Sequence, residues 1–381
     1  MILFFIIFFS LYAAINYYVF IRGWQVLEGL PHLRILYAVV FLILFASYIL
    51  AKFLTEYLPG FLYDLMLWLG SFWFAFMIYF LLSIICIDLI RFVLSQLNLM
   101  PDFVKQNYPY VKHLLGIAVL LIVSLTVLFG YLNTTRLKVK ELNLTLHKGK
   151  SHLRSISAVM VSDIHLSPMD NEPFLSKIVK RINLLNPDIV FIPGDLFDDK
   201  AQVLNERNIG KALFELNPKY GVYASTGNHE FINGIDSAVA YMTNHNIKVL
   251  RDSSVLIDNS FYIVARDDRS KKQFTGEARK SLEEIVKDID RNYPVILMDH
   301  TPLGLGDAEK NNIDLQLSGH THHGQMFPAN LITKMIYEVS WGFLKKNKTR
   351  YYVSCGVGTW GPRVRIGSDS EIVNLKIEFA D

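Results

Sequence analysis

Five short polar segments in the C-terminal two thirds of the chain carry residues that could bind metal ions. They read, in order, Asp163-Ile-His165, Gly194-Asp195-Leu-Phe-Asp198, Gly227-Asn228-His229-Glu230, Asp299-His300 and Gly319-His320-Thr321-His322. Neutral histidine with carboxylate or amide oxygen suits Mn²⁺, Fe or Zn²⁺, whereas a thiolate zinc or iron–sulfur site needs a cluster of cysteines. The chain has only two cysteines. The residue types therefore predict a metal centre of mixed nitrogen and oxygen ligands.

The spacing inside the segments favours two neighbouring metal ions. Asp163 and His165 lie two residues apart and can turn toward one cation. A carboxylate such as Asp195 can bridge two cations. Two metals about 3.5–4 Å apart can polarise a phosphoryl oxygen and hold a hydroxide for in-line attack. The chemistry that these residues predict is metal-assisted hydrolysis.

The elements that position these ligands are expected to be strands. Each segment follows a short, largely apolar run, and the runs read SAVMV, DIVFI, GVYAS, PVILM and DLQLS. Each ligand group would then lie on the loop at the carboxyl end of a strand, where open α/β sheets place their active sites. Apolar residues with helical spacing at 174–185, 207–216 and 281–290 predict helices between later strands, and RLKVKELNLTL, from Arg136, predicts a leading pair of strands.

Together the five segments resemble the signature of the calcineurin-like metallophosphoesterases. That signature is D-x-H, G-D-x-x-D, G-N-H-[DE], a lone His and G-H-x-H, and all five parts occur here in the family's order. The resemblance covers residues 136–381 and implies an α/β fold, a four-layer αββα sandwich with the metal loops along one edge. Seven residues would bind two divalent metal ions (Mn, Fe or Zn). The first ion would be bound by Asp163, His165 and His322, and the second by Asn228, His300 and His320. Asp195 would lie between the two ions.

The same resemblance assigns two residues to proton chemistry. His229 would not bind metal but would face the scissile phosphate, where it stabilises charge or protonates the leaving oxygen, and Asp198 would orient it. Other interpretations stay open from the residues alone. Asp198 could cap a following helix, and a lone His300 after a strand could be a turn histidine. His323 stands at a position where close relatives often have glycine. It could be a supporting hydrogen-bond donor, a substrate contact or a tolerated substitution.

Arginines near two of the predicted loops could contact substrate. Arg363 and Arg365 follow Gly358-Thr-Trp-Gly-Pro, and Arg266 and Arg269 follow the run FYIVA. Arginine forks bind phosphates bidentately, so Arg363 or Arg365 could hold a second phosphoryl group beside the metals. The alternative is a surface ion pair, for example with Glu371.

Composition divides the chain into a membrane part and a globular part. Residues 1–135 hold 6 of the 38 Lys and Arg residues and 5 of the 35 Asp and Glu residues. Four apolar runs there, at about 2–21, 35–53, 66–90 and 114–132, are long enough to cross a bilayer, which takes roughly 20 residues each. The first run lacks a basic start and precedes three more spans, so we expect it to be retained. We therefore predict a multi-pass transmembrane region at 1–135 and a catalytic domain at 136–381.

The charges of the loops bear on which side of the membrane the catalytic domain lies. Loops facing away from the catalytic domain are richer in Lys and Arg than the loop on its own side, which favours an extracytoplasmic domain by the positive-inside rule. Arg136, Lys138 and Lys140 follow the fourth span and count toward a cytoplasmic domain.

The expected function combines these parts. We expect a membrane-bound dinuclear-metal phosphohydrolase, acting through metal-bound hydroxide on phosphodiester or pyrophosphate bonds of a lipid or lipid-linked nucleotide. Some similar bacterial proteins cleave UDP-2,3-diacylglucosamine. The expected partners are membrane lipid and a phosphorylated lipid or small-molecule substrate, with no nucleic acid. The segment from Met335 to Leu344, followed by Lys and Arg, could rest on anionic lipid or pack a loop onto the domain. Alternatives are a non-catalytic receptor or transport module and a protein phosphatase.

Overall fold

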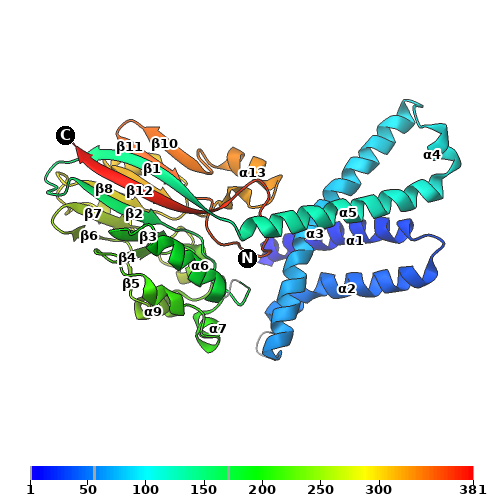
Figure 1. Cartoon of the computed structure of the whole chain (residues 1–381), viewed down its shortest axis with the longest axis horizontal. Coiled ribbons are helices and arrows are strands. Elements are labelled where there is room, and N and C mark those ends of the chain that lie inside the picture. The colour runs from blue at the N-terminus through cyan, green and yellow to red at the C-terminus, as the bar shows by residue number, and fades with distance from the viewer. Residues whose placement is uncertain (1, 55–56, 170–171, 381) are drawn as a thin grey trace. The chain divides into compact units, whose positions relative to one another are not determined.

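The computed structural model describes residues 2–54, 57–169 and 172–380 (Figure 1). The chain divides into two compact units. The first unit comprises Met1–Leu132 with Gly361–Val364, and the second comprises Asn133–Trp360 with Arg365–Asp381. The boundary expected from composition, after residue 135, falls three residues beyond Leu132.

The first unit is helical and contains four helices long and apolar enough to cross a membrane, as the composition predicts. These are α1 (Ile2–Val26), α2 (Pro31–Phe53), α3 (Gly60–Gln96) and α5 (Tyr108–Thr134), and the short α4 (Asp102–Gln106) lies between the last two. Polar side chains join these helices: the Trp73 indole donates to Asn16 at 2.8 Å, and Arg22 pairs with Asp88. Such hydrogen bonds hold apolar helices together where the hydrophobic effect does not. The chain is a membrane protein.

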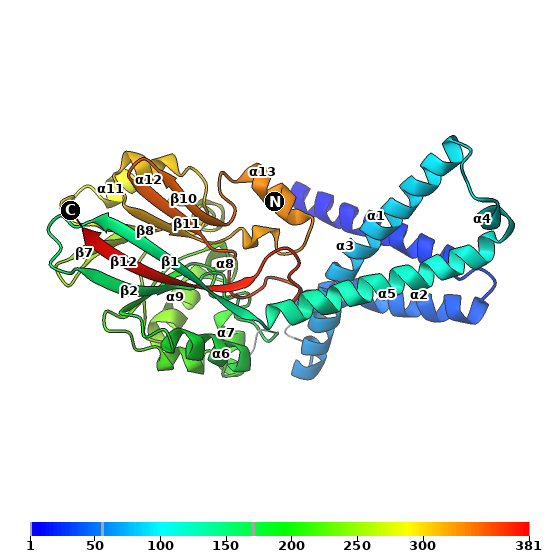
Figure 2. The ribbon, with the colours of Figure 1, turned by 45° about the horizontal axis from the view of Figure 1, so that its top comes forward.

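The second unit is built on two six-stranded sheets (Figure 2). The first has the order β1-β12-β2-β3-β4-β5, with bounds Leu137–His147, Ser370–Ala380, Ser155–Met160, Ile189–Pro193, Val222–Ser225 and Ile247–Val249. The second has the order β10-β11-β9-β8-β7-β6, with bounds Gly342–Lys346, Thr349–Val353, Leu315–Ser318, Val295–Met298, Phe261–Ala265 and Ser253–Ile257. Strands β2 to β5 run parallel to one another, as do β7, β8, β9 and β11.

The second unit has four layers, which pack on one another through three apolar cores. Buried side chains from both sheets, including Phe191 and Met298, fill the space between the sheets. Ile178 and Tyr241 pack helices against the outer face of the first sheet, and Leu282 does so on the second. The helices and helical turns are α6 (Glu172–Asn183), α7 (Ala201–Glu206), η1 (Lys211–Glu215), α8 (Asn228–Ile232), α9 (Ile235–Asn244), α10 (Lys271–Thr275), α11 (Leu282–Ile285), α12 (Gly306–Lys310), η2 (His322–Gly324) and α13 (Ala329–Ile336). The predicted αββα sandwich is confirmed.

Three local predictions were wrong. The run from Arg136 forms one strand, β1, which pairs in parallel with β12 over its whole length, because it contains no Gly or Pro that would break the strand. The helix expected at 207–216 is interrupted at Gly210, whose φ of 108° is left-handed, and only η1 follows. The helix expected at 281–290 is limited to the single turn Leu282–Ile285.

Candidate active site

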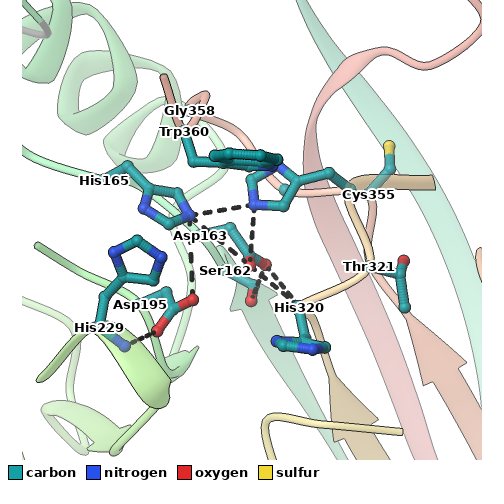
Figure 3. A network of polar contacts seen from close by, with 12 residues as sticks. Ser162, Asp163, His165, Asp195, His229, His320, Thr321, Cys355, Gly358 and Trp360 are labelled. Atoms are coloured by element: carbon teal, nitrogen blue, oxygen red, sulfur yellow. Dashed lines mark hydrogen bonds and ion pairs between the residues drawn. The ribbon is translucent and has the colours of Figure 1, made fainter. Parts of the chain in front are cut away.

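The five predicted metal segments follow the carboxyl ends of five strands and meet at one place. Strands β2, β3 and β4 of the first sheet lead into Asp163, Asp195 and Asn228, and β8 and β9 of the second lead into His300 and His320. The labelled side chains of Asp163, His165, Asp195 and His320 turn toward a common space in Figure 3. The two sheets therefore bring together residues that are up to 159 positions apart in the chain, from 163 to 322.

One group of ligand atoms is contributed by Asp163, His165 and His322. Their donor atoms all lie within 4.8 Å of one another, and all three side chains are buried. The two Nε2 atoms of His165 and His322 are 3.0 Å apart, and His322 Nε2 lies 3.3 Å from Asp163 Oδ1. Two imidazole nitrogens and a carboxylate oxygen thus converge on one point, as three ligands of one cation do.

A second group consists of Asp195, His300 and His320, again within 4.8 Å. His320 Nδ1 lies 2.9 Å from the amide oxygen of Asn228. Asp195 Oδ2 lies 3.0 Å from His300 Nε2 and 3.9 Å from His165 Nε2, so this carboxylate lies between the two groups. This position is the one that a bridging ligand requires.

The surroundings of His300 favour a positive charge beside Asp195. His300 Nδ1 donates to the carbonyl of Pro193 at 2.8 Å, so Nε2 is the ring nitrogen turned toward Asp195. That buried Nε2 faces Asp195 Oδ2 yet makes no hydrogen bond among the described residues. Burial would lower the pKa of His300, but the carboxylate of Asp195 raises it well above its usual value, so a positive charge, from a proton or a cation, is favoured between the two side chains. The residues present therefore suit a metal ion.

The charges of three candidate ligands are those that metal binding needs. Burial alone would raise the pKa of Asp163, but the adjacent His322 outweighs burial and holds that pKa below its usual range. Burial would likewise raise the pKa of Asp195, and neighbouring His300 lowers it well below its usual range. Burial lowers the pKa of His322 to about 4. Asp163 and Asp195 as carboxylates and His322 as neutral imidazole are in the forms that bind metal.

The backbone at the site is held in a sparsely populated conformation. Asp163, His165, Asp195, His320 and His322 all have positive φ, between 46° and 72°. Among the described residues, the positive-φ positions that are not Gly, Asn or Asp all belong to this region: His165, His320, His322, His323 and Gln325. Left-handed backbone is costly for such residues and concentrates where a site must orient side chains.

His229 and Asp198 form a pair beside the metal ligands. His229 Nδ1 lies 2.9 Å from Asp198 Oδ1, and its ring packs edge-to-face on His165 at 4.6 Å between centroids. Burial would lower the pKa of His229, but the carboxylates of Asp195 and Asp198 raise it to about 9. The side chain is 21% exposed, so a substrate can reach it. Asp198 does not cap α7, whose N-cap residue is Lys200.

Sequence reasoning assigned no role to Glu230, which the structure places at the centre of the loop architecture. Its fully buried carboxylate accepts backbone N–H groups of Gly227 at 2.6 Å, Leu196 at 2.8 Å, Asp195 at 3.0 Å and Phe197 at 3.4 Å. One side chain therefore joins the loop after β3 to the loop after β4. The acidic fourth position of the G-N-H-[DE] segment was the available signal.

The predicted substrate arginines lie in different surroundings. Arg365 is fully buried and donates to the carbonyls of Cys355, Gly356 and Gly358 at 2.8, 3.1 and 2.6 Å, and its Nη2 lies 3.2 Å from His322 Nδ1. Arg363 belongs to the segment grouped with the helical unit, where its guanidinium lies 6.0 Å from the ring centroid of Tyr131.

Two further candidates also make contacts within the protein. The ring of His323 is buried, with Nδ1 3.0 Å from Ser340 Oγ. Arg266 lies 3.3 Å from Asp299. Substrate contact by Arg363, Arg365 or His323 stays a prediction.

Comparison with known proteins agrees with the geometry. The calcineurin-like phosphoesterase family model matches residues 156–324. The chain is 31% identical over 289 residues to an uncharacterized metallophosphoesterase of Campylobacter jejuni, covering 73% of this chain and 76% of that protein. It is 29% identical to a transmembrane protein with metallophosphoesterase domain of Danio rerio, covering 68% of this chain and 62% of that longer protein. It is 25% identical to the UDP-2,3-diacylglucosamine pyrophosphatase LpxG of Chlamydia trachomatis, covering 65% of this chain and 91% of that protein. The chain belongs to the calcineurin-like metallophosphoesterase family.

Proposed function

We propose that the chain is a membrane-bound, dinuclear-metal phosphohydrolase that cleaves phosphodiester or pyrophosphate bonds of a lipid or a lipid-linked nucleotide. The observation that carries this proposal is the meeting of two groups of nitrogen and oxygen ligands at Asp195, with the His229–Asp198 pair beside them. Two divalent metal ions bound there would polarise the phosphoryl group and activate water.

The protein's own residues supply the remaining chemistry. Asp163, His165 and His322 would hold one ion and Asn228, His300 and His320 the other, with Asp195 shared. Asp198 fixes the ring of His229 through Nδ1 and leaves Nε2 free to face substrate. The carboxylate of Asp198 raises the pKa of His229 and so favours the protonated imidazole, the form that can donate a proton to the leaving oxygen.

Two observations support a lipid-linked substrate. Four apolar helices anchor the same chain in a membrane, where lipid phosphoesters are concentrated. The relative from Chlamydia is named for the cleavage of UDP-2,3-diacylglucosamine, a nucleotide joined to a diacylated sugar by a pyrophosphate. We extend that substrate class to this chain.

The test is hydrolysis by the detergent-purified full chain with Mn²⁺ and with a chelator control. The substrates are UDP-2,3-diacylglucosamine, an aryl phosphodiester and a set of phosphopeptides. Metal-dependent release of UMP supports the full proposal, and cleavage of the aryl diester alone keeps the phosphoesterase and discards this nucleotide lipid. Preferential dephosphorylation of peptides would identify a protein phosphatase. Binding of two metals without any hydrolysis would favour a non-catalytic module.

A further inference from the structure

Exposed apolar side chains gather on one segment of the second unit. Of the thirteen exposed large apolar residues described in that unit, eight fall between positions 327 and 360. The other five lie at well-separated positions in the chain, such as Leu184, which is 76% exposed. A soluble surface seldom concentrates apolar groups without a partner, so this segment requires an explanation.

Helix α13 carries the centre of this surface. Leu331, Ile332, Met335 and Ile336 are spaced i, i+1, i+4 and i+5, so they share one helical face, and they are 50%, 53%, 79% and 59% exposed. We call these four residues the α13 face. None of the eight residues of α13 is buried. Because so short a helix is marginal by itself in water, a surface that covers its apolar face would stabilise it.

The end of helix α13 lies next to a candidate metal ligand. The helix follows the turn that contains His322, and Tyr337 at its end lies 6.2 Å from His320 between ring centroids. Trp360, 54% exposed, is joined to Gln325 before the helix by hydrogen bonds of 3.1 and 3.2 Å. In Figure 3 the Trp360 side chain lies on the same side of the cluster as His165. A molecule held at this surface is therefore within reach of the site.

Charge indicates what covers the surface. Residues 327–350 contain five Lys and Arg residues and one acidic residue, a net charge of +4. Lys334 lies on α13 itself and is exposed. Apolar and aromatic residues with surrounding cations are typical of segments that lie in the interface of an anionic bilayer. The chain carries its own membrane anchor, since α5 ends at Thr134, three residues before β1 begins.

We propose that the α13 face, with Phe327 and Trp360, inserts into the interfacial layer of an anionic bilayer. A substrate lipid would then present its phosphoryl group to the metal ligands while its acyl chains remain in the membrane. The membrane contact rests on the exposed residues alone, whereas the lipid substrate rests on the proposed function.

The membrane contact is tested by fluorescence quenching, which does not depend on activity. Full-length protein with Cys86→Ser is labelled with a nitrobenzoxadiazole dye at Met335→Cys or, as control, at Leu184→Cys, whose native side chains are 79% and 76% exposed. Cys355 is buried and is not expected to react. In nanodiscs of phosphatidylcholine and phosphatidylglycerol, acyl-chain doxyl lipid should quench the dye at position 335 by about half and spare the dye at 184. Equal quenching at both positions, or at neither, would overturn the proposal.

The substrate part is tested by comparing two hydrolysis rates. For the double variant Met335→Ser/Ile336→Ser, the rate of bilayer-lipid phosphoester hydrolysis divided by the rate of aryl phosphodiester hydrolysis should fall about tenfold. The reason is that two apolar side chains that would insert into the bilayer are lost. The control Leu184→Ser should keep the wild-type ratio. An unchanged ratio in the double variant would refute the delivery of lipid from the membrane. If the wild-type chain cleaves no phosphoester, the proposed function fails, and the quenching result still decides the membrane contact.

Discussion

Replacing Glu230 by glutamine should loosen the metal loops by a predictable amount. The carboxylate accepts four backbone N–H groups, two on each oxygen: Gly227 and Asp195 on Oε2, and Leu196 and Phe197 on Oε1. In glutamine one oxygen becomes an NH₂ group, so two N–H donors lose their acceptor. At about 1.5–3 kcal/mol for each hydrogen bond to a charged group, the free energy of unfolding should fall by about 3–6 kcal/mol.

The assay is thermal unfolding of the metal-loaded full chain in detergent, followed by tryptophan fluorescence. A loss of about 3 kcal/mol lowers the Tm of a unit this large by about 6–12 °C. Glu283 is exposed, and the matched change Glu283→Gln should alter stability by less than about 0.5 kcal/mol. A Tm for Glu230→Gln within about 1 °C of wild type would refute the inference that this carboxylate holds the two loops.

Three further substitutions test other parts of the site. His229→Ala should retain both metals but slow aryl diester hydrolysis by about 10²-fold or more; unchanged turnover would remove the proton-transfer role. Gly227→Ala should weaken metal binding in a calorimetric titration with Mn²⁺, because the added Cβ would lie 2.1 Å from Asp195 Oδ1 and 2.6 Å from the Asp195 backbone nitrogen; wild-type affinity would show that the loop moves freely. Arg365→Lys should lower the Tm, because lysine lacks the planar fork that donates to three backbone carbonyls and Ser368; a wild-type Tm would contradict this bracing role.

The placement of the metal segments was predictable because it depends on local signals. Each ligand group follows a short apolar run that forms a strand, and parallel strands end at the same edge of a sheet. The family resemblance carried by the five ordered segments then implied the sandwich. The four apolar helices were predictable for a similar reason, since length and composition suffice for a membrane span.

The structural features that the sequence did not predict depend on contacts between positions far apart in the chain. Glu230 accepts a hydrogen bond from the backbone N–H of Asp195, which lies 35 residues earlier in the chain, and no periodicity in the sequence indicates that contact. The left-handed turn at Gly210 and the uninterrupted pairing of β1 with β12 depend on tertiary structure in the same way. The burial of Arg365 beneath the loop of Cys355 to Gly358 is a further example, because its sequence context resembles that of an exposed phosphate-binding arginine.

The central claim is a pair of metal ions that share Asp195, and the most direct test is a metal count. The full chain is loaded with Mn²⁺, desalted and analysed by inductively coupled plasma mass spectrometry. It should contain two metal ions per chain. Asp195→Asn should lose both together, because its carboxylate lies 3.0 Å from His300 of one group and 3.9 Å from His165 of the other. An Asp195→Asn variant that still holds two ions with wild-type affinity would contradict the shared site.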